Sequence, residues 1–210
     1  MEDYSFWMLF LSAAILLNIA PGPDMIYLIS KTMSQGKRVG FASILGLGTG
    51  ALIHTLFVSL GISAIISTSV VVFKMIKYTG AAYLFYLGIK ALLSGGLKFK
   101  ENKKKEGKSS FFKSFSQAVI IDITNPKVAL FFIAFLPQFY RDNGTSKIAQ
   151  FMTLGLIIIL IGFIVESLIV LLSDKIAHLL KKKPIVSIVL DKVFGTVLIG
   201  LGIRLVVQKD

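Results

Sequence analysis

Long uninterrupted runs of apolar residues constrain this chain more than any other feature of its sequence. Six runs can be read, and each has about 20–27 residues, enough for a helix to cross the roughly 30 Å hydrocarbon core of a bilayer. The runs cover residues 6–30, 39–65, 70–93, 112–136, 148–172 and 185–207. Charged residues make up only 16% of the 210 residues, whereas soluble domains carry about 25%. The pattern therefore excludes a water-soluble globular domain, and the same composition excludes disorder.

The runs also predict the kind of secondary structure. A segment that crosses lipid must satisfy all its backbone polar groups internally, which only α-helices and closed barrels achieve. Barrel strands would show about ten residues of alternating polarity, and these runs do not alternate. The sequence thus predicts an all-α membrane protein with six transmembrane helices, and with the lipid bilayer as its surroundings.

The distribution of lysine and arginine predicts the orientation of these helices. The stretches in and beside loops 31–38, 94–113 and 173–184 carry 15 such residues, against six on the opposite side. Basic loops remain in the cytoplasm. We therefore expect these three loops to be cytoplasmic and both termini to lie outside.

The excess of basic residues could indicate another partner. A net charge of +12 would suggest nucleic acid in a soluble chain. Here many of the lysines gather in the segment 94–113, which we interpret as a solvated, topology-setting linker. Binding of this segment to anionic lipid or nucleic acid is the alternative. We predict no nucleic-acid partner.

The linker divides the chain into two halves of three spans, residues 1–93 and 114–210. Leu87-Gly88-Ile89-Lys90, which ends the third span, weakly resembles Leu201-Gly202-Ile203-Arg204, which ends the sixth. Because three is an odd number, the halves must have opposite orientations in the membrane. The sequence therefore predicts a 3+3 inverted repeat, a common construction in secondary transporters.

Prolines interrupt the first span of each half. Pro21-Gly22-Pro23 lies inside the first run, and Asn125-Pro126 lies inside the fourth. A proline in a helix interior removes a backbone hydrogen bond and clashes with the preceding turn. We expect spans one and four to be broken helices, with each join buried or lining a cavity at membrane depth.

A charged residue follows the proline at each join, Asp24 in the first span and Lys127 in the fourth. Asn125 is a good N-cap and Pro126 a good first helical residue, and Gly22-Pro23 can play the same parts. Asp24 and Lys127 would then occupy matching positions in the two first turns, and we expect Lys127 to pair with Asp24 or Asp122. Free N–H groups there would attract an anion and orphaned carbonyls upstream a cation, so an amino acid would suit such a join. The alternative is that Asp24 is only a cap and Lys127 reaches an interface.

Two further titratable residues lie inside spans. His54 lies near the middle of the second run and could relay protons, or it could make one hydrogen bond to a neighbouring helix. Glu166 lies inside the fifth run, where a carboxylate is costly and usually faces a cavity. It could carry a proton, or lie protonated near an interface.

Several of these motifs together resemble one family over nearly the whole chain. They are Asn18-Ile-Ala-Pro-Gly-Pro-Asp24, Gly46-Leu-Gly48-Thr-Gly50 with His54, Gly80-Ala-Ala-Tyr83-Leu-Phe-Tyr-Leu-Gly88, and Asn125-Pro-Lys-Val-Ala-Leu-Phe-Phe132 leading to Leu136-Pro-Gln-Phe139. The chain resembles the LysE/RhtB family of amino-acid exporters. The resemblance implies export of an amino acid from the bacterial cytoplasm across the inner membrane, driven by protons, and a homodimer. Asp122 departs from the asparagine of many members.

The sequence therefore predicts a secondary transporter that exports an amino acid or close derivative by proton antiport. The alternatives are an exporter of another small solute, such as a cation or drug, and an intramembrane enzyme or scaffold. No Walker A, His-Glu-x-x-His or Gly-x-Ser-x-Gly motif occurs, so we expect no enzymatic activity, cofactor or metal. The candidate residues for substrate binding and proton coupling are Asn18, Pro21, Gly22, Pro23, Asp24, His54, Asp122, Asn125, Pro126, Lys127 and Glu166.

Overall fold

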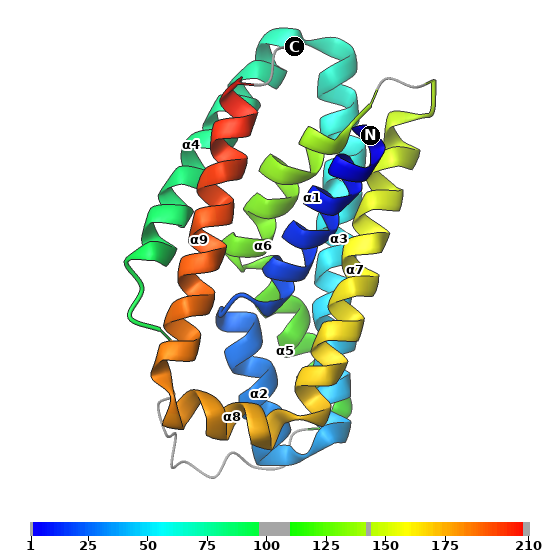
Figure 1. Cartoon of the computed structure of the whole chain (residues 1–210). Helices are drawn as coiled ribbons and strands as arrows, with labels where there is room; N and C mark the ends of the chain where they lie inside the picture. The colour runs from blue at the N-terminus through cyan, green and yellow to red at the C-terminus, as the bar shows by residue number, and fades with distance from the viewer. Residues whose placement is uncertain (1, 97–109, 142–143, 208–210) are drawn as a thin grey trace.

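The computed structural model describes residues 2–96, 110–141 and 144–207, and in these ranges every regular element is helical. The helices form an elongated bundle, with the start of α1 and the end of α9 at one end and α8 lying across the other (Figure 1). The elements are α1 Glu2–Ile19, α2 Pro23–Gln35, α3 Lys37–Thr68, α4 Val70–Leu92, α5 Phe111–Ile123, α6 Pro126–Leu130, the π-helical turn η1 Phe131–Phe135, the 3₁₀ turn η2 Leu136–Phe139, α7 Lys147–Leu171, α8 Ser173–Lys182 and α9 Pro184–Val207.

Helix length and composition identify the membrane spans. Three helices are each long and apolar enough to cross a bilayer alone: α7, α9 and the part of α3 from Lys37 to Ile65. Tyr4–Ile19 with Pro23–Gln35, and Phe111–Ile123 with Pro126–Phe139, meet the same criterion as bent pairs, with bends of 52° and 50°. The all-α membrane class and the breaks in spans one and four are therefore confirmed.

The sixth expected span, α4, is different in composition. It has 23 residues and so a length of about 34 Å. It carries Lys74, Lys77 and Lys90, and it is not among the helices that meet the criterion for a span. The 3+3 inverted arrangement and the division at residues 94–113 remain predictions.

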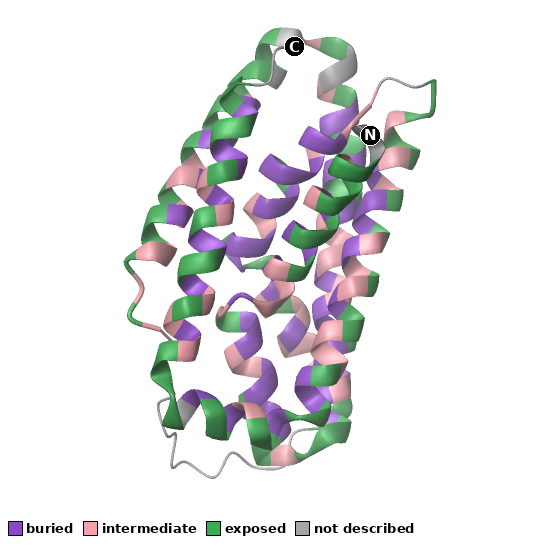
Figure 2. Cartoon of the chain, viewed as in Figure 1, coloured by how far each residue is buried: buried purple, intermediate pink, exposed green. Residues whose placement is uncertain are grey.

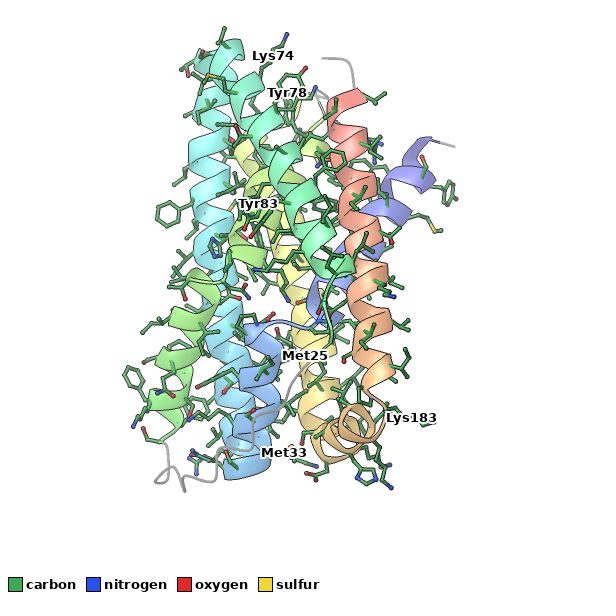
Figure 3. All side chains as sticks on the ribbon, turned by 90° about the vertical axis from the view of Figure 1, so that its left-hand side faces the viewer. Met25, Met33, Lys74, Tyr78, Tyr83 and Lys183 are labelled. Carbon is green, nitrogen blue, oxygen red and sulfur yellow. The ribbon has the colours of Figure 1, made fainter. Side chains whose placement is uncertain are left out.

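The bundle has an apolar exterior as well as an apolar core. Figure 2 shows buried residues along the inner faces of the helices and exposed residues on the outer faces. Many exposed side chains are large and apolar, among them Phe57, Leu160 and Val71. A surface of this kind fits contact with lipid. Charged and polar side chains occur at both ends, with Lys74 and Tyr78 at one end and Lys183 at the other (Figure 3).

Two clusters of buried side chains hold the bundle together. The larger includes Phe10, Phe131, Phe135 and Phe139, whose rings contact one another between α1 and the η1–η2 turns. The smaller joins Met25, Leu28 and Ile29 of α2 to Ala177 and Leu180 of α8. The second half of broken span one is thus anchored to the helix that crosses the end of the bundle.

Close helix crossings occur at glycines. A Cβ on Gly46 would overlap the backbone carbonyl of Phe115, so the backbones of α3 and α5 approach each other closely there. Gly88 of α4 and Gly195 of α9 face each other in the same way, each close to the carbonyl oxygen of the other. Small residues at such crossings allow membrane helices to approach closely.

Two expected loops differ from the structure. Segment 31–38 is helical except at Gly36, whose φ of 89° lets the chain reverse between α2 and α3 in one residue. Segment 173–184 contains α8, an amphipathic helix that the apolar-run analysis did not predict. Residues 97–109, most of the expected linker 94–113, lie outside the described residues, and α5 already begins at Phe111.

Candidate functional site

The join in span one leaves little room for a side chain. Helix α1 ends at Ile19 and α2 begins at Pro23, the expected first helical residue. Gly22 occupies the N-cap position in an extended conformation and no side chain caps α2. A Cβ on Gly22 would lie 3.0 Å from Lys127 Nζ and nearer still to the Asp24 carboxylate. The join is therefore shaped around these two charged groups.

The join in span four has the predicted cap. Asn125 Oδ1 accepts a hydrogen bond from the backbone N–H of Lys127 at 3.0 Å, and Pro126 is the first residue of α6. Lys127 is therefore the second residue of α6, as Asp24 is the second residue of α2. The expected equivalence of the two positions is confirmed.

Lys127 joins the two breaks. Its Nζ lies 2.8 Å and 3.2 Å from the carboxylate oxygens of Asp24. The same Nζ donates to the carbonyl oxygens of Leu17 at 3.2 Å and Ala20 at 3.1 Å. The predicted pairing with Asp24 is confirmed, and the alternative that Lys127 reaches an interface is wrong, because its side chain is buried.

These contacts change the expected role of the carbonyls at the first break. A helix carries partial negative charge at its C-terminal end, where its last carbonyls lack intrahelical partners. We expected the carbonyls at the end of α1 to attract the cationic group of a bound ligand. The structure instead has Lys127 of the other broken span in that position, so the protein supplies the cation.

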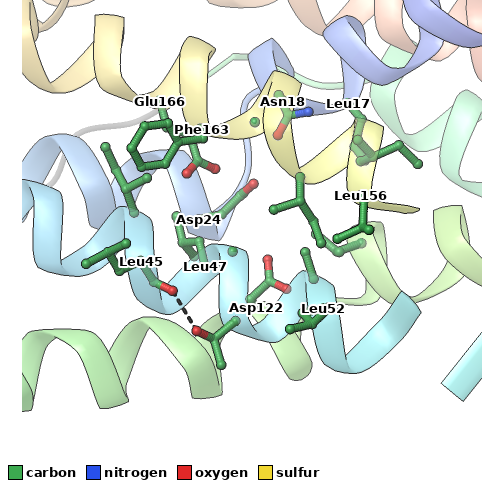
Figure 4. A pocket seen from close by; sticks show the side chains of 18 of the residues that line it. Leu17, Asn18, Asp24, Leu45, Leu47, Leu52, Asp122, Leu156, Phe163 and Glu166 are labelled. Carbon is green, nitrogen blue, oxygen red and sulfur yellow. Dashed lines mark hydrogen bonds between the residues drawn. The ribbon is translucent and has the colours of Figure 1, made fainter. Parts of the chain in front are cut away.

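A cavity of about 240 Å³ lies beside the breaks. The end of α1 and helices α2, α3, α5 and α7 contribute to its lining, which is mostly apolar (Figure 4). Its charged lining residues are three carboxylates, Asp24, Asp122 and Glu166. They come from three different helices and lie around the same space (Figure 4).

Asp122 is the most enclosed of the unpaired acids. Its exposed fraction is 4%, and no hydrogen-bond partner of its Oδ2 exists among the described residues. Helix α3 makes room for it with a glycine, because a Cβ on Gly50 would lie 2.5 Å from Asp122 Cβ. A buried carboxylate oxygen without a partner is costly. This oxygen is enclosed beside the Cβ position of Gly50 and has no hydrogen-bond partner among the described residues.

Glu166 and Asn18 are two further polar residues of the lining. Glu166 is half-buried on α7. Asn18 Nδ2 donates to the carbonyl oxygen of Ala14 at 2.8 Å. Gly162 of α7 leaves space for the amide of Asn18, because a Cβ there would lie 2.7 Å from Asn18 Oδ1.

His54 lies behind the cavity rather than in its lining. Its Nε2 is 3.3 Å from the carbonyl oxygen of Asp122, and its ring stacks on Phe132 with the centroids 5.8 Å apart. Phe132 does line the cavity. The alternative of one hydrogen bond to a neighbouring helix therefore describes the geometry of His54.

The structure separates the candidate residues into two groups. Four of them line the cavity: Asn18, Asp24, Asp122 and Glu166. The others form or support the joins around it: Pro21, Gly22, Pro23, His54, Asn125, Pro126 and Lys127. Sequence reasoning predicted Glu166 of α7 but missed the neutral lining residues of α3 and α7, among them Gly48, Thr49 and Phe163, which carry no charge to mark them.

The three carboxylates are not arranged as a metal site. Within residues 2–96, 110–141 and 144–207, no group of three or more His, Asp or Glu side chains lies close enough to hold a metal ion. The cavity is slightly smaller than the roughly 300–1,000 Å³ of typical drug-sized ligand sites. Its dimensions suit a small organic molecule.

Comparison with known proteins identifies a family for the chain. A family model described as LysE type translocator matches residues 15–209. The membrane protein YrhP of Bacillus subtilis is 31% identical over 202 residues, which are 93% of this chain and 95% of that protein. The homoserine/homoserine lactone efflux protein of Salmonella typhi is 31% identical over 200 residues, 95% of each chain. A membrane protein of Vibrio cholerae is 30% identical over 208 residues, 99% of each chain.

No solved structure matches the chain. The family resemblance expected from the sequence motifs is confirmed by the family match and by the relatives, which span nearly the whole chain. The chain therefore belongs to the LysE type translocator family, and it is a multi-pass membrane protein of the exporter type.

Proposed function

We propose that this protein exports a small amino acid or a close derivative from the bacterial cytoplasm in exchange for protons. The observation that carries the proposal is the cavity beside two broken spans, lined by the carboxylates of Asp24, Asp122 and Glu166. Ionisable residues at membrane depth commonly mark substrate and proton pathways. A relative named for efflux of homoserine and its lactone supports a ligand of this size.

The pairing of Asp24 divides the roles among the three acids. Asp24 is held by Lys127, so its carboxylate mainly fixes the geometry between the two breaks. We assign the exchange of a substrate ammonium group for a proton to Asp122 and Glu166. Both line the cavity, and Asp122 Oδ2 has no protein partner within the described chain.

The proton gradient is a sufficient energy source for such an exporter. A net inward movement of one charge through 100 mV releases about 2.3 kcal/mol. Because about 1.4 kcal/mol corresponds to a tenfold concentration ratio, this supports roughly a fiftyfold substrate gradient. No cofactor is needed for that coupling.

The orientation belongs to the same proposal. We place the protein in the inner membrane with both termini outside and the α8 end in the cytoplasm. Lys175, Lys182 and Lys183 are exposed at that end, as the positive-inside rule requires of a cytoplasmic surface. Labelling a cysteine at position 183 from outside intact cells would contradict this orientation.

The test is flux through the purified protein in proteoliposomes loaded with L-homoserine. An inward proton gradient should accelerate homoserine release, and a protonophore should abolish the acceleration. A charge-assisted contact is worth about 1.5–3 kcal/mol, so Asp122→Asn and Glu166→Gln should each reduce coupled release by about tenfold or more.

Asp174→Asn is the matched control, because Asp174 is an exposed carboxylate on α8, away from the cavity. It should release homoserine as fast as the unaltered protein. A rate of homoserine release that is the same with and without the proton gradient would contradict the coupling. A counterflow panel of other small cations would reveal a different substrate class.

A further inference from the structure

Helix α8 is built differently from the helices that span the membrane. It has ten residues, among which Lys175, His178 and Lys182 are exposed while Ala177 and Leu180 are buried. A helix with one apolar face and a basic polar face is typical of segments that lie in the plane of a membrane interface. Helix α8 also runs across the bundle, whereas α7 and α9 run along it (Figure 1). Its residue pattern and its direction therefore indicate an interfacial position.

The buried face of α8 rests on the second half of broken span one. Ala177 and Leu180 share a buried cluster with Met25 of α2. In Figure 3, Lys183, which follows α8, lies between the levels of Met25 and Met33. Helix α8 thus packs against the side of α2 rather than beyond its end. The opposite face of α8 therefore points away from the bundle, toward the surrounding leaflet.

That outward face carries two lysines with a leucine between them. Lys175, Leu179 and Lys182 follow one another at intervals of four and three residues, which places them along one side of a helix. At about 100° per residue, this side is opposite to Ala177 and Leu180. All three side chains are exposed, Leu179 to 43%. The arrangement suits the boundary between lipid headgroups and acyl chains, where lysines reach outward from an apolar contact.

The charge of this face is available to a partner outside the protein. Among the residues that the structure describes, no carboxylate forms an ion pair with Lys175 or Lys182. Asp174 is exposed on α8 but lies on another side of the helix. Lys37 and Arg38, at the start of α3, are exposed at the same end of the bundle (Figure 1). Acidic phospholipids attract such groups, by about fivefold in affinity for each lysine.

We propose that α8 is an interfacial helix that binds anionic phospholipid through the face formed by Lys175, Leu179 and Lys182. The lysine ammonium groups lie at the lipid phosphates, and Leu179 lies among the first acyl carbons. A zwitterionic lipid has the same phosphate but carries its own cation, so the face selects acidic headgroups. Because α8 packs on α2, the bound lipid stabilises the position of the helix that carries Asp24. This surface goes beyond the proposed export function and does not depend on it.

Fluorescence quenching by brominated lipids tests the proposal. Trp7 is the only tryptophan of the chain, so Trp7→Phe with Leu179→Trp places a single reporter on the outward face. The full chain is reconstituted in equal mixtures of phosphatidylglycerol and phosphatidylcholine, with bromine on the acyl chains of one lipid or of the other. Quenching should give an association constant for phosphatidylglycerol about fivefold or more above that for phosphatidylcholine, the factor that one lysine contributes.

Leu160→Trp in the Trp7→Phe background is the matched control, because Leu160 is 60% exposed in the middle of α7. Both lipids should quench this reporter equally. Absence of quenching of Leu179→Trp by either lipid would show that the face is turned to water, and would overturn the proposal. Equal quenching by the two lipids would overturn it too, because the contact would then lack selection for charge. Neither result would affect the export function, since the measurement needs no substrate.

Variants of the basic residues identify the source of the preference. Lys175→Gln with Lys182→Gln should bring the ratio of the two association constants close to unity. Lys74→Gln with Arg204→Gln, which alters two exposed residues at the other end of the bundle, should leave the ratio unchanged. Equal losses in the two pairs would reduce the preference to the net charge of the protein, and would overturn the proposal.

Inorganic phosphate distinguishes a lipid headgroup from a soluble anion. Added at constant ionic strength, it should leave the ratio for the Leu179→Trp reporter unchanged, because the face meets a phosphate that is already fixed in the bilayer. Loss of the preference in phosphate would assign the two lysines to a soluble anion, and would also overturn the proposal.

Discussion

The two breaks have nearly the same bend, 52° and 50°, but they are built differently. Both begin a new helix with a proline, at Pro23 and Pro126. The second break is capped by the side chain of Asn125, whereas Gly22 at the first break provides no side-chain cap. The similar bends follow from proline in both spans. The different caps follow from what each join has to accommodate.

The residue after each proline shows the difference most clearly. Asp24 suits the positive start of α2, but Lys127 at the start of α6 does not suit its own helix end. Lys127 is stabilised from the other break, by the Asp24 carboxylate and by two carbonyls near the end of α1. The first break thus has no room for a side-chain cap, because the Lys127 side chain of the second break occupies that space.

Loss of Lys127 is the strongest way to break this arrangement. Lys127→Met would leave the Asp24 carboxylate buried without its cation, which costs about 3–5 kcal/mol of folding free energy. Thermal unfolding of the purified protein in detergent measures the loss. Lys192→Met is the matched control, since Lys192 also belongs to a span but is exposed. Equal stability of the two variants would contradict a structural role for the pair.

A double variant sharpens the same point. Asp24→Asn in the Lys127→Met background removes the unpaired charge, and should recover about 1–3 kcal/mol of the loss. Recovery of stability without recovery of transport would separate the structural role of the pair from the exchange of ions. An additive loss in the double variant would show that the two side chains act independently.

The second largest effect is expected where α3 packs on the second break. Gly50→Ala would place a Cβ 2.5 Å from Asp122 Cβ, and overpacking of this kind costs about 1–3 kcal/mol. Gly61→Ala is the control on the same helix, because nothing lies within 4 Å of its Cβ position. Unfolding in detergent compares the two. Equal unfolding temperatures would show that α3 and α5 separate easily at this crossing.

How far sequence could predict this site depends on how local its causes are. The breaks, the Asn125 cap and the pairing of Lys127 follow from proline chemistry and from the need of a buried charge for a partner. By contrast, the position of His54 depends on how α3 is rotated, which no local rule determines. The sequence left His54 either as a proton relay or as the partner in one hydrogen bond to a neighbouring helix, and the structure has it 3.3 Å from the Asp122 carbonyl oxygen.

Two other features could not be predicted from the sequence for similar reasons. Among the α8 residues whose burial is described, Ser173, Ala177 and Leu180 are the buried ones, too few positions to stand out within a lysine-rich segment. The apolar and glycine lining from α3 and α7 looks like any other membrane helix surface until the helices are packed. Polar residues identified the site, but neutral residues that shape it required the structure.

The smallest effect concerns the caps themselves. Asn125→Ala should cost about 1 kcal/mol, because the N–H of Lys127 loses its acceptor. Asn125→Gly should cost only a few tenths of a kcal/mol, as glycine caps usually do. Gly22 already serves the first break in this way. Unfolding in detergent should therefore rank the alanine variant below the glycine variant. If both lose the same stability, the second break depends on the Asn125 side chain for more than its cap, and the two breaks differ more deeply than their equal bends suggest.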